Sequence, residues 1–293
     1  MKNKKHCEIT DRDYKLLRFL WKWKVVSTKA LAKKFFYEAN AFTAYRRLLH
    51  LESDGFIGAY PVDGRFNEAW ILKEKGFKYI LPHLGDLQSK GYKSANYPHD
   101  FLATAFHLGD WLTQQPGNTQ TYSEQQLRCY PADLWPPWIP RSALHRPDGY
   151  SAYQSSEKRV VVAFEAEISP KAKKRYERVV TFYDNQPGIH YVFWLVDSKG
   201  TLNSVRRNFE KLQVREWSKH QFILLSEFKQ KGWLAQFIEG KSTGGSPFQF
   251  LCPNPHSIPP QSSLSCGTLA LLDSRRRPIN STTCPFKPNA QKA

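Results

Sequence analysis

The sequence predicts a mixed α/β (α+β) protein with two folded domains and a disordered tail. The chain has 293 residues, close to twice the size of an average domain. Helical periodicity dominates its first quarter, whereas short apolar strand segments alternate with helical segments further along. From residue 241 onward Pro, Ser, Thr, Gly and Asn dominate and the periodicity disappears. The expected divisions are a domain over 8–81, a linker over 82–98, a domain over 99–240 and a tail over 241–293.

The chain is strongly basic, and the charge is unevenly distributed. It contains 43 Lys and Arg against 26 Asp and Glu, a formal net charge of +17. The first 80 residues have a net charge of +8, residues 81–240 a net charge of +4, and the tail a net charge of +5. Such an excess indicates a polyanionic partner, with nucleic acid as the first candidate. A generic basic surface is the alternative, and composition alone does not separate the two.

Several classes of protein are excluded by composition. No apolar run is long enough to cross a bilayer, and the basic N-terminus lacks the apolar segment of a secretory signal. The five Cys are irregularly spaced, which predicts neither a disulfide framework nor a metal knuckle. Aromatic residues make up 14% of the chain, enough to form folded cores. We therefore expect a soluble cytoplasmic protein without membrane insertion.

The sequence of the N-terminal domain predicts three helices followed by a hairpin. Thr10 is placed to cap a first helix, and Ser27 or Thr28 precedes a second. A third helix is expected over 41–53, with Gly55 at its end. Two strand-like segments, 56–60 and 68–72, then flank a turn rich in Pro, Asp and Gly. This order predicts a winged helix, in which the third helix enters the major groove of DNA.

The basic and polar residues of the second and third helices are the expected DNA contacts of this domain. Side chains on the third helix would face bases, and lysines on the second would meet phosphates. A solvated basic helix face is the alternative. The candidate DNA-binding residues are Lys33, Lys34, Thr43, Tyr45, Arg46 and Arg47.

The second domain alternates helices with strands. The segment that begins at His99 has the periodicity of a helix, and a Pro- and Trp-rich stretch over 131–140 predicts a loop. Two apolar strands flank a strongly basic helix that begins at Lys171. The expected elements are helices over 99–112, 122–129, 171–182 and 205–212, and strands over 160–167, 189–197 and 221–225.

Three carboxylates are expected at one edge of the sheet in this domain. Asp148 precedes an apolar strand that ends in Glu165-Ala166-Glu167, and the alternation of a strand places both glutamates on one face. Antiparallel pairing across the intervening turn would bring Asp148 beside Glu165. Carboxylate oxygens are the ligands that Mg²⁺ and Mn²⁺ prefer, and clustered carboxylates repel one another without a cation. In a basic chain this pattern favours metal-dependent phosphodiester cleavage.

The alternative is that these acids pair with the basic helix that follows, which begins with Lys171, Lys173, Lys174 and Arg175. In the catalytic interpretation, Lys173, Lys174 and Arg175 instead contact backbone phosphates. Arg146 beside Asp148 is a further candidate for a phosphate contact, because guanidinium binds phosphate in a bidentate manner.

Pro147-Asp148 followed by Glu165-Ala166-Glu167 resembles the PD-(D/E)xK core of restriction-endonuclease-like nucleases. The resemblance implies that Asp148 and Glu165 bind the metal ion. The third position of this motif is usually Lys, whereas this chain has Glu167, a variant that some restriction enzymes share. Either Glu167 or Lys171 would then polarise the attacking water. Many members also place a Glu on the first core helix, and Glu124 is the candidate here.

A wider resemblance covers about residues 8–240. The expected winged helix, the helix that contains His99 and His107, and the segments His145-Arg-Pro-Asp-Gly and Phe164-Glu-Ala-Glu together resemble MobC-type plasmid mobilisation relaxases. These proteins are also grouped as the replication-relaxation family. The resemblance implies a site- and strand-specific nick at a plasmid transfer origin. It also implies an accessory mobilisation protein and a conjugative coupling protein as partners.

Two other functions stay open at this point. The chain could be a non-catalytic DNA-binding regulator or replication accessory protein with a degenerate nuclease fold. It could also be a double-strand restriction enzyme. His99 and His107, eight residues apart, fall on one side of their helix and would approach the metal site, although His107 is expected in the core. In the tail, Arg275, Arg276 and Arg277 could form a basic arm on DNA.

Overall fold

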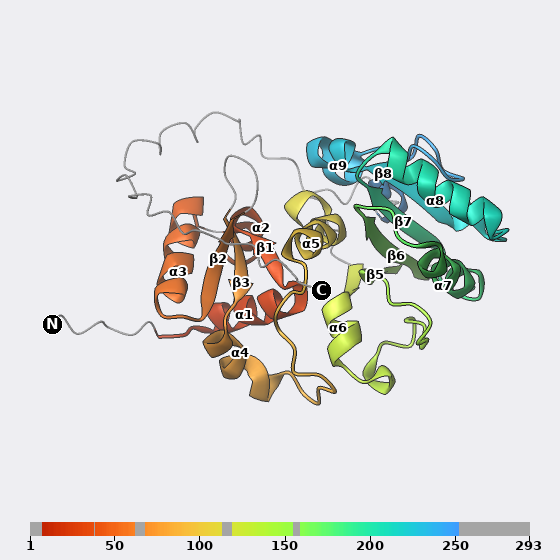
Figure 1. Ribbon diagram of the computed structural model, residues 1–293. Coiled ribbons are helices and arrows are strands. Elements are labelled where there is room, and N and C mark those ends of the chain that lie inside the picture. The colour runs from red at the N-terminus through yellow and green to blue at the C-terminus, as the bar shows by residue number, and fades with distance from the viewer. Residues whose placement is uncertain (1–7, 38, 62–67, 113–118, 155–158, 252–293) are drawn as a thin grey trace, which may run out of the picture. The chain divides into compact units, whose positions relative to one another are not determined.

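The structure is a computed structural model that describes residues 8–37, 39–61, 68–112, 119–154 and 159–251. It is a mixed α/β protein with two sheets (Figure 1), as the sequence predicts. The described residues all belong to one compact unit. The turn expected between the first two strand-like segments and the tail from 252 onward lie outside the described residues.

The N-terminal part combines four helices with a small antiparallel sheet of order β1-β3-β2. Its helices are α1 (Asp11–Trp23), α2 (Thr28–Phe35), α3 (Ala41–Ser53) and α4 (Glu74–Ile80). Its strands are β1 (Val25–Ser27), β2 (Ile57–Pro61) and β3 (Glu68–Leu72). The first helix begins where expected, because Thr10 and Asp13 form a reciprocal capping box. The strand β1 was not predicted, since three residues are too few to show a pattern by themselves.

Helix α5 (Tyr97–Leu112) packs against both sheets of the described chain. Phe101 lies in a small cluster with Val25 and Ile71 of the N-terminal sheet. One turn further along, Phe106 contacts Phe164 of the larger sheet, with ring centroids 5.0 Å apart. The helix therefore joins the N-terminal part to the C-terminal part through buried apolar contacts.

The larger sheet has five strands in the order β4-β5-β6-β7-β8. Its first three strands are antiparallel, and β6, β7 and β8 run parallel. The strands are β4 (Thr119–Ser123), β5 (Gly149–Gln154), β6 (Arg159–Glu167), β7 (Tyr191–Val196) and β8 (His220–Leu224). The helices around them are α6 (Glu124–Cys129), α7 (Lys173–Asp184), α8 (Lys199–Lys211) and α9 (Leu225–Lys231). The helix expected from residue 122 instead begins at Glu124, because Ser123 ends β4 and caps α6.

Helices cover both faces of this sheet (Figure 1). On one face, Val161 and Ala163 of β6 pack in a cluster with residues of α7 and α8. On the other face, Val162 and Phe164 pack with residues of α5 and α9. This alternation places the odd-numbered positions of β6, Glu165 and Glu167 included, on the α7 side.

Part of the expected disordered tail is folded. Residues 241–251 form a turn and a short helix, α10 (Pro247–Leu251), so the prediction is wrong for this segment. Phe250 explains the order, because its ring lies 4.9 Å from that of Tyr191 on β7. None of the helices in the described part of the chain is long and apolar enough to cross a membrane.

Candidate functional site

Asp148 and Glu165 lie next to each other on neighbouring antiparallel strands. Asp148 directly precedes β5, and the register pairs Gly149 with Phe164, so the next pair along is Asp148 with Glu165. The main chain of Asp148 donates to the carbonyl of Phe164 over 3.1 Å. Its side-chain Oδ2 accepts from the Ala166 N–H over 2.7 Å. The predicted antiparallel pairing is thus confirmed, and the carboxylate of Asp148 replaces a main-chain acceptor at the end of the ladder.

Glu165 is buried and held by two side chains. The hydroxyl of Tyr183 on α7 donates to Glu165 Oε1 over 2.5 Å. His145 Nε2 lies 2.5 Å from the same oxygen. Burial raises the pKa of Tyr183 well above its usual value, so its hydroxyl stays protonated as a donor. These contacts fix the orientation of the Glu165 carboxylate beside Asp148.

Glu167, two residues further on, has a separate set of partners. Tyr176 of α7 donates its hydroxyl to Glu167 Oε1 over 3.0 Å, and Lys171 Nζ lies 3.9 Å from the same oxygen. Burial raises the pKa of Glu167, while the charge of Lys171 opposes the shift. Lys171 thus lies beside Glu167, as the alternative of pairing between the acids and the basic residues predicts. It precedes α7, which begins at Lys173 and not at Lys171 as expected.

The electrostatics of Asp148 differ from those of an ordinary surface carboxylate. Burial raises the pKa of Asp148 to about 7; the charge of His99 opposes this shift and that of Glu165 adds to it. His99 Nε2 lies 3.5 Å from Asp148 Oδ2, and a hydrogen bond with Asp100 is the main cause that raises the pKa of His99 to about 9. In the described chain, no Lys or Arg forms an ion pair with Asp148 or Glu165. Among the described residues, the side chains that lie at ion-pair distance from these two acids are therefore histidines.

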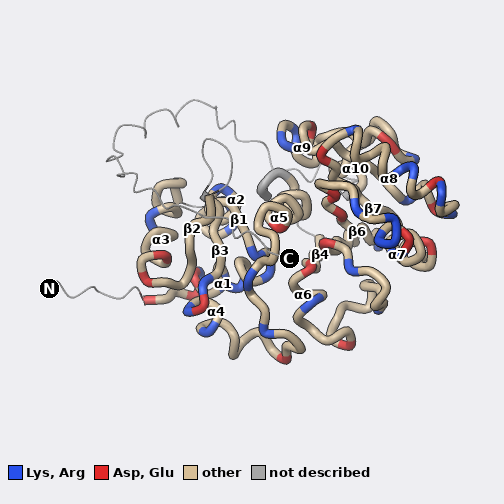
Figure 2. Tube along the Cα trace, viewed as in Figure 1, with Lys and Arg blue, Asp and Glu red and all other residues tan. Residues whose placement is uncertain are grey.

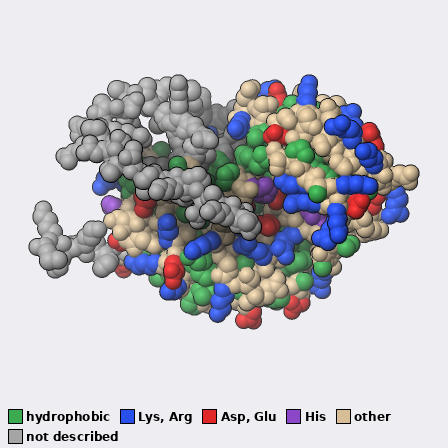
Figure 3. Space-filling view, viewed as in Figure 1, with side chains coloured by type: hydrophobic (Ala, Val, Ile, Leu, Met, Phe, Trp, Pro, Cys, Tyr) green, Lys and Arg blue, Asp and Glu red, His purple; other side chains and the backbone are tan. Residues whose placement is uncertain are grey.

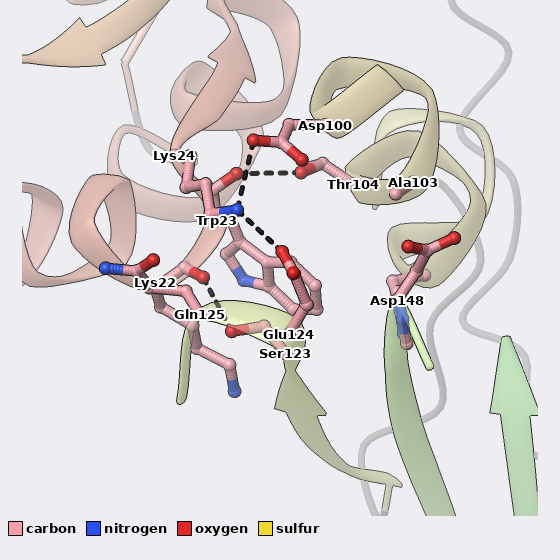
Figure 4. Close-up of a pocket in the computed structure, with 11 residues that line it drawn as sticks. Lys22, Trp23, Lys24, Asp100, Ala103, Thr104, Ser123, Glu124, Gln125 and Asp148 are labelled. Carbon is pink, nitrogen blue, oxygen red and sulfur yellow. Dashed lines mark hydrogen bonds and ion pairs between the residues drawn. The ribbon is translucent and has the colours of Figure 1, made fainter. Parts of the chain in front are cut away.

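Asp148 also lines a cavity of about 20 Å³, enough for about one water molecule. Figure 4 shows Lys24 between Asp100 and Glu124 on another wall of this cavity, with Nζ distances of 3.1 and 2.7 Å. Lys24 has a positive φ of 61°, which an L-residue adopts only when its surroundings hold it there. Glu124, the candidate for the core-helix Glu, thus lines the same cavity as Asp148 but forms its ion pair with Lys24.

The carboxylates fit a hard divalent cation through their chemistry. Within the described ranges, no group of three or more His, Cys, Asp or Glu side chains is arranged to hold a metal ion. Mg²⁺ is commonly bound by one or two carboxylates, with water and substrate phosphate as the other ligands. Asp148 and Glu165 match that smaller set, and the side chain of Asp148 keeps 16% of its surface exposed. These two residues would hold the ion.

The basic side chains at the start of α7 form no ion pairs with the carboxylates of the motif in the described part of the chain. Lys173, Lys174 and Arg175 are exposed, and Lys173 lies 3.7 Å from Glu177 within the same helix. Figure 2 shows basic positions grouped along α7. Among the described residues, Lys171 is the basic side chain that forms an ion pair with the acidic cluster, and the charge of Arg175 also acts on Glu167. Arg146 is exposed next to the site.

The N-terminal candidates divide into exposed and inward-facing side chains. Thr43 and Arg46 are exposed on α3, and the Arg46 guanidinium lies 5.8 Å from the centre of the Phe42 ring. Arg47 instead reaches back to α1, where its guanidinium pairs with the fully buried Asp13. Tyr45 packs edge-on against Trp70 of β3, with centroids 6.3 Å apart. The prediction that Arg47 and Tyr45 face outward is therefore wrong, because both help to hold α3 against the core.

Other basic side chains remain at the surface. Lys33 and Lys34 are exposed in the last turn of α2. On the face shown in Figure 3, Lys and Arg side chains run across the middle of the molecule, beside a few acidic side chains. His107 is fully buried between Trp23 and Phe164, in the core as expected.

Three residues of this site were not predicted from the sequence. Tyr176 and Tyr183 are seven residues apart, which places them on one side of α7, but tyrosines at that spacing usually belong to a core. No sequence pattern predicted the ion pairs of Lys24, because its acidic partners Asp100 and Glu124 are far away in the sequence. No protein-family model, no curated protein and no solved structure matches this chain.

Proposed function

We propose that this protein is a metal-dependent DNA endonuclease. The observation that carries the proposal is the pair Asp148 and Glu165, adjacent on β5 and β6 and without a Lys or Arg partner among the described residues. Two neighbouring acids that are wholly or largely removed from water are unfavourable unless a proton or a cation compensates them. The net charge of +17 on the same chain supports a polyanionic substrate.

The particular activity we propose is a single-strand nick of the relaxase type, at a plasmid transfer origin. The order of three helices and a hairpin in the N-terminal part supports a winged helix that positions the duplex. The exposed Thr43 and Arg46 on α3 would contact it. Under this proposal, an accessory mobilisation protein and a conjugative coupling protein are the partners of the nicking protein.

Each residue of the carboxylate site has a proposed role. Asp148 and Glu165 would hold Mg²⁺ or Mn²⁺, while Tyr183 and His145 keep Glu165 in the required orientation. When bound, the cation lowers the pKa of a water ligand and neutralises charge on the scissile phosphate. Glu167 with Lys171 orients the attacking water. The exposed Lys and Arg side chains at the start of α7 contact the phosphates that flank the cut.

The test is a nicking assay on a supercoiled plasmid that carries the protein's own origin region, with Mn²⁺ and with EDTA. We expect open-circular product in Mn²⁺ only. The Asp148→Ala and Glu165→Ala variants should lose nicking by at least about a hundredfold, because each removes a ligand of the cation. Both should still retard the origin duplex in a gel. Asp133→Ala removes a carboxylate at an exposed position and serves as the matched control. Full nicking by either site variant would refute the assignment, and linear product would indicate a double-strand enzyme.

A non-catalytic DNA-binding protein is the second candidate. It is favoured by the engagement of Glu165 and Glu167 with tyrosine hydroxyls, which satisfies two of the three acids without a cation. Calorimetry separates the two functions. Heat of Mn²⁺ binding in the wild type that is absent from Asp148→Ala supports the nuclease. No binding heat, together with an uncut plasmid, supports the regulator.

A further inference from the structure

A second concave surface lies between helices α1 and α2 of the N-terminal part and helix α6, which follows β4 of the larger sheet. Its volume is about 380 Å³, within the range of clefts that hold small ligands. Lys22 is shared between this groove and the small cavity beside Asp148. The groove therefore adjoins the carboxylate site but does not overlap with its acidic residues.

Four basic side chains line the groove, and none of its described lining residues is Asp or Glu. Lys15, Arg18 and Lys34 are exposed, and within the described residues none of the three forms an ion pair with a carboxylate. Lys22 Nζ donates to the carbonyl and hydroxyl of Thr121, over 2.6 and 2.9 Å. Burial, with the charge of Lys34 added, lowers the pKa of Lys22 to about 7. An anionic ligand would relieve the repulsion among these like charges.

Aromatic rings form the apolar part of the same groove. Phe19 and Phe35 contact each other edge-on at 5.5 Å, and Lys34 Nζ lies 5.2 Å from the centre of the Phe19 ring. On the α6 side, Tyr130 contacts the buried Trp21 at 5.5 Å. Phe19, Phe35 and Tyr130 are only half-buried and keep surface open to the groove.

We infer that this groove binds a short length of single-stranded DNA, with phosphates on Lys15, Arg18 and Lys34 and bases against Phe19, Phe35 and Tyr130. Interleaved cations and half-exposed rings are what an unpaired strand requires, since its phosphates and the faces of its bases are both accessible. A duplex keeps its base faces stacked inside and offers only phosphates. The choice of DNA rests on the proposed function, in which one strand is cut beside the groove.

The test is fluorescence anisotropy with a labelled twelve-nucleotide oligo-dT in EDTA, where no cleavage occurs. We expect the double variant Lys15→Gln/Lys34→Gln to weaken binding about tenfold and to reduce the salt slope by about 1.4, because two phosphate contacts are lost. Phe35→Leu should weaken binding about fivefold through lost stacking and leave the salt slope unchanged. The matched control, Lys199→Gln/Lys229→Gln, removes two exposed charges outside the groove and should bind like the wild type. Thermal melting verifies that each variant is folded.

Equal affinity of the groove variants and the control would overturn the inference. So would tighter, groove-dependent binding of a duplex or of an RNA of the same length. The Asp148→Ala variant should bind oligo-dT like the wild type, because Asp148 does not line the groove. A wild-type protein that binds oligo-dT through the groove but never nicks the plasmid would contradict the nuclease alone. Normal nicking with groove variants that bind oligo-dT like the wild type would contradict the groove alone.

Discussion

Gly149 sets the position of Asp148, and an added methyl group tests this role. A Cβ atom at Gly149 would lie 2.5 Å from His107 Nε2 and 2.7 Å from the carbonyl oxygen of Tyr122. Cβ atoms essentially never approach other heavy atoms within 3.0 Å. His107 is fully buried on α5, and the Tyr122 carbonyl belongs to the backbone of β4. A shift of either neighbour would cost free energy, because one is a buried side chain and the other is strand backbone. The Gly149→Ala substitution must therefore displace the start of β5.

The expected effect has a structural part and a functional part. Overpacking of a tight interior costs about 1–3 kcal/mol, so we expect the free energy of unfolding of Gly149→Ala to fall by about 2 kcal/mol. Asp148 is the preceding residue, and its main chain is bonded to Phe164. A shift of about 1 Å in a catalytic group can reduce a rate about a hundredfold, which is the loss of Mn²⁺-dependent nicking that we expect.

Urea unfolding followed by tryptophan fluorescence measures the first effect, and the plasmid nicking assay measures the second. Gly188→Ala is the matched control, because a Cβ atom at Gly188 meets nothing within 4 Å. It should unfold and nick like the wild type. If Gly149→Ala unfolded at the same urea concentration as Gly188→Ala, the packing argument would be refuted.

Two further substitutions test the core around the site. Arg47→Met should lower the free energy of unfolding at pH 7 by about 3 kcal/mol, because it leaves the buried Asp13 carboxylate without its guanidinium partner. Arg46→Met, at an exposed position, is the control, and equal urea midpoints for the two variants would contradict this prediction. Burial lowers the pKa of His220 to about 3, so the folded state keeps this imidazole neutral while the unfolded state protonates it below about pH 6.5. The protonation of His220 in the unfolded state should therefore lower the free energy of unfolding by about 1.4 kcal/mol for each pH unit as the pH falls from 6.5 to 3. His220→Gln, which still offers Trp194 an acceptor, should show a shallower pH dependence, and an unchanged one would be evidence against this interpretation.

Local sequence signals predicted much of the framework that supports the site. The capping residue Thr10 and the turn glycine Gly55 marked helix ends correctly, because a cap depends on residues within one turn. The apolar run that ends in Glu165-Ala166-Glu167 predicted a strand with both glutamates on one face, since side-chain direction in a strand follows from its period of two. The pairing of Asp148 with Glu165 was also predictable, because a short connection between strands favours an antiparallel pair.

The N-terminal helices show where prediction from periodicity stops. Arg47 and Tyr45 have polar groups that suit a DNA-facing surface, but the structure turns both toward the core. Their direction depends on the angle at which α3 crosses the rest of the domain, and a buried carboxylate on α1 provides the partner for Arg47. A polar side chain on a helix therefore shows its role only when the packing of that helix is known.

The sequence by itself determined the mixed α/β class, the strong positive charge and the three acids at one edge of a sheet. The first two follow from composition and periodicity, and the third follows from the alternation of a strand together with antiparallel pairing across one short turn. Only the tertiary structure decided which other side chains reach those acids. His99 and Tyr183 are 49 and 18 residues from Asp148 and Glu165 and contact them in the folded protein. The ion pairs of Lys24 with Asp100 and Glu124 join positions about 75 and 100 residues apart along the chain. No local pattern encodes such contacts, because they depend on how α5 and α7 pack against the sheet.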